Sequence, residues 1–269
     1  MDIQSFLSLA FVRYALVSVV LLAVMSGVVG TYVVTRRMVF AAGGITHASF
    51  GGIGLAYFLG LDPTLGALVF AVITALSVNW VSARGMVRQD SAIAMLWSLG
   101  MAVGVIFLSL TPGYAPNLMG FMFGDVLAVS AADVLANAVV AVACVAAVVA
   151  FYRPLLYSSF DPVYARLSGW HPGLVSTVAS VFVALAISFS IKSVGIILVL
   201  SVFTIPQAIA MTFVHTLPKI MVLSGVVALV GCVAGLLASF FFDLPSGAVI
   251  TAVLSVALLI IKLLCKRGQ

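Results

Sequence analysis

The chain has 269 residues, of which 64% are hydrophobic and only 7% are charged, and its formal net charge is +5. A composition this apolar excludes a soluble globular domain. The three cysteines form no C-x-x-C motif, which leaves no indication of a thiol redox centre or a cysteine metal cluster.

Apolar stretches of 18 or more residues recur along the whole chain, and each predicts a membrane-spanning helix. No small-residue cleavage site follows the first stretch, so we interpret it as a retained helix rather than a signal peptide. No polar region is long enough for a second domain. We therefore predict an all-α polytopic membrane protein with one transmembrane domain over residues 1–269. The nine predicted spans lie near residues 11–34, 39–60, 63–83, 91–110, 130–150, 173–191, 193–214, 220–242 and 247–265.

The number of spans depends on the break between the sixth and the seventh, where only Lys192 and its neighbours interrupt the apolar sequence. Eight or ten spans are the alternatives. The positive-inside rule supports nine, because the lysines and arginines then divide ten to two between the two sides of the membrane. This division predicts an external N-terminus and a cytoplasmic C-terminus, and it explains the positive net charge without a nucleic-acid partner.

The second span contains the single histidine predicted at membrane depth, His47. Gly43 and Gly51 lie one helical turn away on either side of it, so the ring is expected to face protein or a water-filled path rather than lipid. A metal ligand in a transport path and a packed histidine that bonds a neighbouring carbonyl are both compatible with the sequence. Small residues that allow close helix packing recur beside it at Gly44, Ala48, Gly52 and Ala56.

Further polar side chains within the predicted spans include Asn79, Thr204 and Gln207. Pro206 removes a backbone hydrogen bond and is expected to kink the seventh span. Thr204 and Gln207 flank this kink, and a broken helix with free carbonyl groups can line a transport path. We interpret Asn79, Thr204 and Gln207 as candidate path-lining residues, although most such side chains bond other backbone groups or helices.

The loop of residues 153–172, "RPLLYSSFDPVYARLSGWHP", is the longest one predicted in the cytoplasm. Asp161 suits a helix N-cap, Pro162 suits the first helical position and Gly169 suits a C-terminal cap. This pattern predicts a helix of about two turns. Such a helix either fits a groove on another protein or connects two spans without a partner.

Motifs that would indicate an enzyme are missing. The chain has no G-x-x-x-x-G-K-[ST], no H-E-x-x-H and no G-x-S-x-G. Energy for transport is therefore expected from an ion gradient or from a separate protein.

Four stretches resemble the membrane permease subunits of bacterial ABC importers for zinc, manganese and iron. "RRMVFAAGGITHASFGGIGLAY" is similar to a family segment with the pattern R-R-M followed by G-D-x-[LI]-[ST]-H-A. "MGFMFGDVLAVSAADV" and "SSFDPVYARLSGW" are similar to the family's L-F-G-D-[IL]-L and F-D-P-x-x-A-x-x-x-G segments. The fourth stretch, "SVGIILVLSVFTIPQAIAM" continuing to "FFFDLPSGAVI", completes a match in order and spacing over nearly the whole chain.

The resemblance implies a homodimer in a bacterial cell membrane, two cytoplasmic ATP-binding subunits and an external metal-binding protein. It implies no permanently bound cofactor, since the divalent metal is the cargo and ATP binds the partner subunit. The segment of residues 161–169 resembles the part that docks on the ATPase, with the matching residues Asp161, Pro162, Ala165 and Gly169.

The chain departs from the family pattern at Gly43, where the resemblance leads us to expect an aspartate one turn before the histidine. Another oxygen ligand, a second copy of His47 or selectivity in the external binding protein could compensate. An imidazole without a carboxylate favours zinc as the cargo, before manganese or iron.

Two other functions stay open from the sequence. A permease of the same architecture for a metal chelate, such as a siderophore or corrinoid, would have a wide cavity that does not need histidine. A secondary carrier driven by protons or sodium would use His47 as a proton relay, but the sequence shows no intramembrane acid and no clear inverted repeat.

Overall fold

The computed structural model describes residues 10–85, 87–112, 124, 126 and 129–266. All regular secondary structure within these residues is helical, and nine segments are long and apolar enough to cross a membrane, which confirms the predicted fold class. In chain order these segments are Phe11–Thr35, Val39–Leu59, Pro63–Ala83, Gln89–Leu110, Ala131–Ala150, Pro172–Val194, Ile196–Phe213, Leu217–Phe242 and Ser246–Cys265. The second of the four stretches that resemble the permease family falls largely outside the described residues.

The chain forms two compact units. Unit 1 comprises Met1–Thr35, Asn117–Ala141 and Phe189–Gln269, and unit 2 comprises Arg36–Pro116 and Val142–Ser188. Two long helices, α8 (Ala131–Ala150) and α11 (Pro172–Val194), contribute residues to both units.

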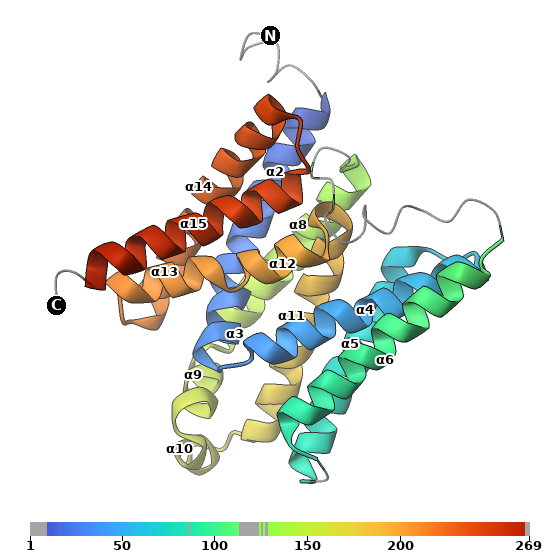
Figure 1. Cartoon of the computed structure of the whole chain (residues 1–269). Helices are drawn as coiled ribbons and strands as arrows, with labels where there is room; N and C mark the ends of the chain where they lie inside the picture. Colours follow the sequence, from blue (N-terminus) through green and yellow to red (C-terminus); the bar gives the residue numbers. More distant parts are fainter. Residues whose placement is uncertain (1–9, 86, 113–123, 125, 127–128, 267–269) are drawn as a thin grey trace. The chain divides into compact units, whose positions relative to one another are not determined.

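Unit 2 contains a group of three packed helices, α4 (Val39–Leu59), α5 (Pro63–Ala83) and α6 (Gln89–Leu110). They lie side by side in Figure 1. The turn from α4 to α5 is short because Gly60 adopts the left-handed conformation, with φ of 68°, and the Asp62 side chain then caps α5 by accepting a hydrogen bond from the Thr64 amide at 2.7 Å.

Two short helices, α9 (Tyr152–Phe160) and α10 (Pro162–Leu167), connect α8 to α11. The sequence predicted the second of them but not the first. Pro154 does not prevent α9, since it lies in the first turn of this helix, where the missing amide hydrogen has no helical partner to lose.

Unit 1 begins with the first span, which consists of α2 (Ala10–Met25), the π-helix η1 (Ser26–Gly30) and α3 (Thr31–Thr35). The seventh span is broken into α12 (Ile196–Val202) and α13 (Ile205–Phe213), as Pro206 predicted. The last two spans, α14 (Leu217–Phe242) and α15 (Ser246–Lys266), pack against each other.

The sixth and seventh spans are separated at Gly195 rather than at Lys192. Gly195 has a φ of 80°, which an L side chain rarely adopts, whereas Lys192 belongs to the last turn of α11. The ammonium group of Lys192 lies 2.7 Å from the carboxylate of Asp133 on α8. Ser193, the next residue, accepts a hydrogen bond from the side chain of Asn137, also on α8, at 2.7 Å. The charge that interrupts the apolar sequence therefore joins two helices instead of ending one.

Candidate functional site

His47 is the one residue between positions 41 and 54 of α4 that is not buried. The helix around it is closely packed because glycine and alanine make up much of this stretch. The imidazole ring is therefore accessible to a ligand, whereas the neighbouring residues of the helix are buried.

The accessible imidazole stacks on the indole of Trp97 from α6. The two ring centroids are 4.2 Å apart and the ring planes differ by 8°. A stacked indole covers one face of the imidazole and leaves the nitrogen atoms at the ring edge free to bind a metal or a proton. Trp97 could not be identified from the sequence, since its contact with His47 depends on the register between α4 and α6.

Contacts between small residues set this register. A methyl group built on Gly51 or Gly100 would meet backbone atoms of the other helix, and the same is true of Gly104 with the backbone of Phe50. The backbones of α4 and α6 therefore approach closely on the side that carries His47 and Trp97.

The predicted stripe of small residues is divided between two neighbouring helices. Gly44 lies against Ile93 and Ala48 lies against Gly100, both on α6, whereas Gly52 and Ala56 lie against Gly66 on α5. All four stripe residues are buried, at Gly44, Ala48, Gly52 and Ala56. This double packing holds α4 from two sides and fixes the place of His47.

Asn79, a candidate path-lining residue, lies on α5. Its side-chain nitrogen is buried and has no hydrogen-bond partner among the described residues. This amide is a free donor, but no contact of Asn79 with His47 is found in the described structure.

The break in the seventh span is a second concentration of polar groups. Pro206 has no amide hydrogen, so the carbonyl of Val202, four residues earlier, loses its helical partner. The Ser26 hydroxyl of η1 donates a hydrogen bond to this carbonyl at 2.6 Å. The π-helix in the first span thus satisfies the group that the proline leaves free.

Gln207 completes this network. Its side chain is 0% exposed, and its amide donates to the Ser26 carbonyl at 2.7 Å and to the Ser26 hydroxyl at 2.9 Å. The Thr204 hydroxyl donates to the carbonyl of Leu200 at 2.8 Å within the same span. The described contacts of these two candidate path-lining residues therefore stabilise the broken helix.

The short helix α10 has the capping that its sequence predicts. The carboxylate of Asp161 accepts hydrogen bonds from the amides of Val163 and Tyr164 at 3.1 and 2.9 Å, and Pro162 occupies the first turn. Gly169 adopts a φ of 83° directly after Ser168, the C-terminal cap of the helix, and Ala165 is fully buried.

Large apolar side chains are exposed on α10 and directly before it. Leu167 is 82% exposed, Val163 is exposed on the same helix, and Phe160 is exposed at the end of α9. Arg36 anchors the preceding helix, since its guanidinium group donates to the carbonyls of Ser158 and Ser159 at 2.8 and 3.2 Å. Exposed apolar side chains on a capped helix that follows an anchored one suit a docking element.

Within the described parts of the chain, no group of three or more His, Cys, Asp or Glu side chains is arranged to hold a metal ion. His47 is thus the one predicted ligand that the described structure places within a span, with Trp97 as its ring partner.

Residues 8–265 match the ABC 3 transport family. The manganese transport system membrane protein MntC of Halalkalibacterium halodurans is 32% identical, over 93% of this chain and 85% of that protein. The solved structure of PsaBC from Streptococcus pneumoniae in complex with Fab is similar with a TM-score of 0.86 and 26% identity, over 96% of this chain and 93% of that one. An ABC transporter of metal-chelate type in an inward-facing conformation shares the fold, with a TM-score of 0.73 at 16% identity over 93% and 85% of the two chains.

Proposed function

The chain belongs to the ABC 3 transport family as a multi-pass metal ABC transporter permease, and from this premise we propose that it carries manganese past His47 at the interface of a homodimer. ATP is hydrolysed by a separate subunit in such systems. The observation that carries the proposal is the accessible imidazole of His47 in an otherwise buried stretch of α4.

The proposed cargo is manganese because the relative at 32% identity is a manganese transport protein. The sequence analysis favoured zinc, since an imidazole without a neighbouring carboxylate resembles a zinc ligand. Manganese prefers oxygen ligands, which backbone carbonyls and water can supply around a single histidine. Zinc is therefore the first competitor in any uptake experiment.

The test is uptake by the permease reconstituted with its ATP-binding subunit, with radioactive manganese, zinc and iron, each with and without ATP. We expect ATP-dependent uptake of manganese that excess zinc inhibits. Uptake of zinc but not manganese would reject the proposed cargo, and uptake without nucleotide would reject the proposed energy source.

We place the contact with the ATP-binding subunit on α10. The capped helix exposes Val163 and Leu167, and Phe160 at the end of α9 is exposed directly before it. The lysine and arginine distribution predicts that this loop lies on the cytoplasmic side. ATP binding would then favour one of two states of the permease through contacts with this helix that differ between the states.

Cross-linking tests this contact. A cysteine in place of Val163 is expected to form a cross-link to the ATP-binding subunit, whereas a cysteine in place of Leu244, which is exposed and predicted on the external side, is not. Equal cross-linking at both positions, or none at Val163, would contradict the placement of α10.

The alternatives from the sequence are not favoured. The similarity to the metal-chelate type transporter is at 16% identity and shows a shared fold alone. The match to the ABC 3 transport family favours an ATP-driven transporter over a carrier driven by protons or sodium.

A further inference from the structure

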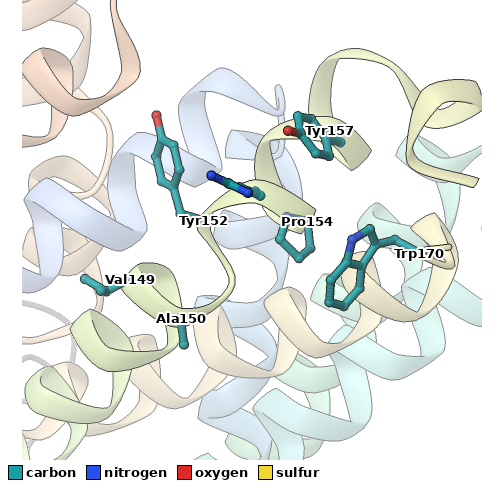
Figure 2. A pocket seen from close by; sticks show the side chains of 7 residues that line it. Val149, Ala150, Tyr152, Pro154, Tyr157 and Trp170 are labelled. Atoms are coloured by element: carbon teal, nitrogen blue, oxygen red, sulfur yellow. The ribbon is translucent and has the colours of Figure 1, made fainter. Parts of the chain in front are cut away.

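Unit 2 contains a cavity of about 500 Å³ that is separate from His47. Figure 2 shows the rings of Tyr152, Tyr157 and Trp170 around Pro154, with the end of α8 beside them. The complete lining consists of Val149, Ala150, Tyr152, Arg153, Pro154, Tyr157 and Trp170. The volume is within the range of sites for small organic ligands.

The cavity lies at the boundary of the membrane. Val149 and Ala150 are the last residues of the fifth span, and Trp170 comes two residues before the sixth. Because one loop joins these two spans, both ends are on the same side of the membrane. Tryptophan and tyrosine are typical of this interfacial region, where the ring contacts acyl chains and the polar atom contacts headgroups.

The charge of the cavity is positive. Arg153 makes no ion pair among the residues that the structure describes, whereas Arg36 is bonded to the end of α9 and Arg84 lies over the ring of Trp80. The one acid in the loop, Asp161, is occupied by the cap of α10. The cavity therefore offers an uncompensated guanidinium group beside hydroxyl and indole donors.

The backbone adds to this preference for an anion. The helix α9 begins at Tyr152 without a side-chain cap, and Tyr152, Arg153 and Pro154 of its first turn line the cavity, so the positive end of the helix dipole lies beside it.

An exposed apolar stripe leads along α8 to the cavity. Val142, Ala146 and Val149 are exposed at intervals of four and three residues, and they form one apolar face that reaches the cavity rim. Val149 is 74% exposed. A molecule with a hydrocarbon chain on this stripe would place its polar end in the cavity.

We propose that this cavity binds the headgroup of an anionic phospholipid, with Arg153 and the tyrosine hydroxyls on the phosphate and the acyl chains along the exposed face of α8. The predicted cytoplasmic side of this loop agrees with the site, because anionic lipids are attracted to basic residues on that side. The ligand class is a phosphodiester, and the apolar stripe identifies a lipid rather than free phosphate as its source.

The experiment is native mass spectrometry of the full-length chain, with dioleoyl phosphatidylglycerol and dioleoyl phosphatidylcholine as competing probes. The variants are Arg153→Gln and the matched control Arg88→Gln, which removes an exposed arginine from another loop predicted on the same side. We expect wild type and Arg88→Gln to bind more phosphatidylglycerol than phosphatidylcholine. In Arg153→Gln, the ratio of bound phosphatidylglycerol to bound phosphatidylcholine should fall about fivefold.

A second variant, Trp170→Ala, should weaken retention of both lipids because it removes the ring and not the charge. Equal preference in Arg153→Gln and Arg88→Gln would overturn the proposal. So would displacement of the lipid by millimolar inorganic phosphate, which would indicate a site for the free anion. Loss of lipid binding only when the ATP-binding subunit is present would also overturn it, because that subunit rather than a lipid would then occupy the cavity.

Discussion

The second and the seventh spans differ in the burial and hydrogen bonding of their polar side chains. At the break of the seventh span, the buried Ser26 hydroxyl donates to the Val202 carbonyl, and the buried Gln207 side-chain nitrogen donates to the carbonyl and hydroxyl of Ser26, while Gln207 Oε1 has no hydrogen-bond partner among the described residues. In the second span, His47 has a stacked ring beside it and retains part of its surface.

This difference separates polar groups that hold the fold from polar groups that are available to a ligand. A buried donor or acceptor without a partner destabilises the fold, so a break in a helix needs partners on another helix. A histidine that is held by stacking keeps its nitrogen atoms free. The following variants test whether the two regions differ in this way.

The largest effect is expected from His47→Ala. If the imidazole binds the passing metal, ATP-dependent uptake should fall by about tenfold or more, in line with the loss of a metal-site residue. Assembly should be unchanged and the loss of thermal stability should be small, because the described contacts of the ring are its stacking on Trp97, which contributes about 0.5–1.5 kcal/mol, and include no hydrogen bond. The control is Ser49→Ala on the same helix, whose hydroxyl bonds only the Ile45 carbonyl at 2.8 Å. Normal uptake in His47→Ala would show that His47 does not bind the metal on its way through the permease.

Gln207→Leu is expected to affect mainly the stability of the fold, whereas His47→Ala is expected to affect mainly uptake. Removing the amide leaves the Ser26 carbonyl without this donor in a buried site, so the free energy of unfolding should fall by about 1–3 kcal/mol. Thermal unfolding in detergent measures this loss. Ser188→Ala is the matched control, since its hydroxyl bonds a carbonyl of its own helix at 2.8 Å. Unchanged stability together with lost uptake would indicate that Gln207 lines the transport path and does not stabilise the fold.

Gly43→Asp adds the carboxylate that the family resemblance leads us to expect one turn before His47. Residues 43 and 47 share a helix face, and a carboxylate suits manganese better than an imidazole does. The ratio of manganese to zinc uptake should rise severalfold, with Gly43→Ala as the control for the added side chain. An unchanged ratio would show that selectivity is determined elsewhere.

The smallest effect is expected from Trp97→Phe. A smaller ring keeps part of the stacking, and an aromatic pair contributes about 0.5–1.5 kcal/mol. Uptake should fall by less than in Trp97→Ala, which leaves the imidazole without its ring partner. Equal uptake in wild type and both variants would mean that stacking does not position His47.

Much of the fold could be predicted from the sequence because hydropathy and helix capping are local properties. Apolar stretches identified the nine spans, Pro206 identified the break in the seventh, and Asp161 with Pro162 predicted the start of α10. The break at Gly195 was misplaced to Lys192, because the sequence shows a charge but not its ion pair with Asp133.

The surroundings of the candidate site could not be predicted in the same way. Trp97 and the division of the small-residue stripe between α5 and α6 depend on contacts between helices. The π-helix at Ser26–Gly30 has no clear local signal, and its role emerges only through the carbonyl that Pro206 leaves free. His47 was found because an ionisable residue is rare within a span.

The most direct test of the central claim is the accessibility of position 47 in the assembled transporter. A His47→Cys variant, with Cys144, Cys232 and Cys265 replaced, is treated with a membrane-impermeant thiol reagent at each stage of the ATP cycle. We expect the thiol to react in one nucleotide state and manganese to slow the reaction. A thiol that reacts only with a lipid-soluble reagent, in every state and regardless of metal, would place position 47 against lipid and rule out a transport path past His47.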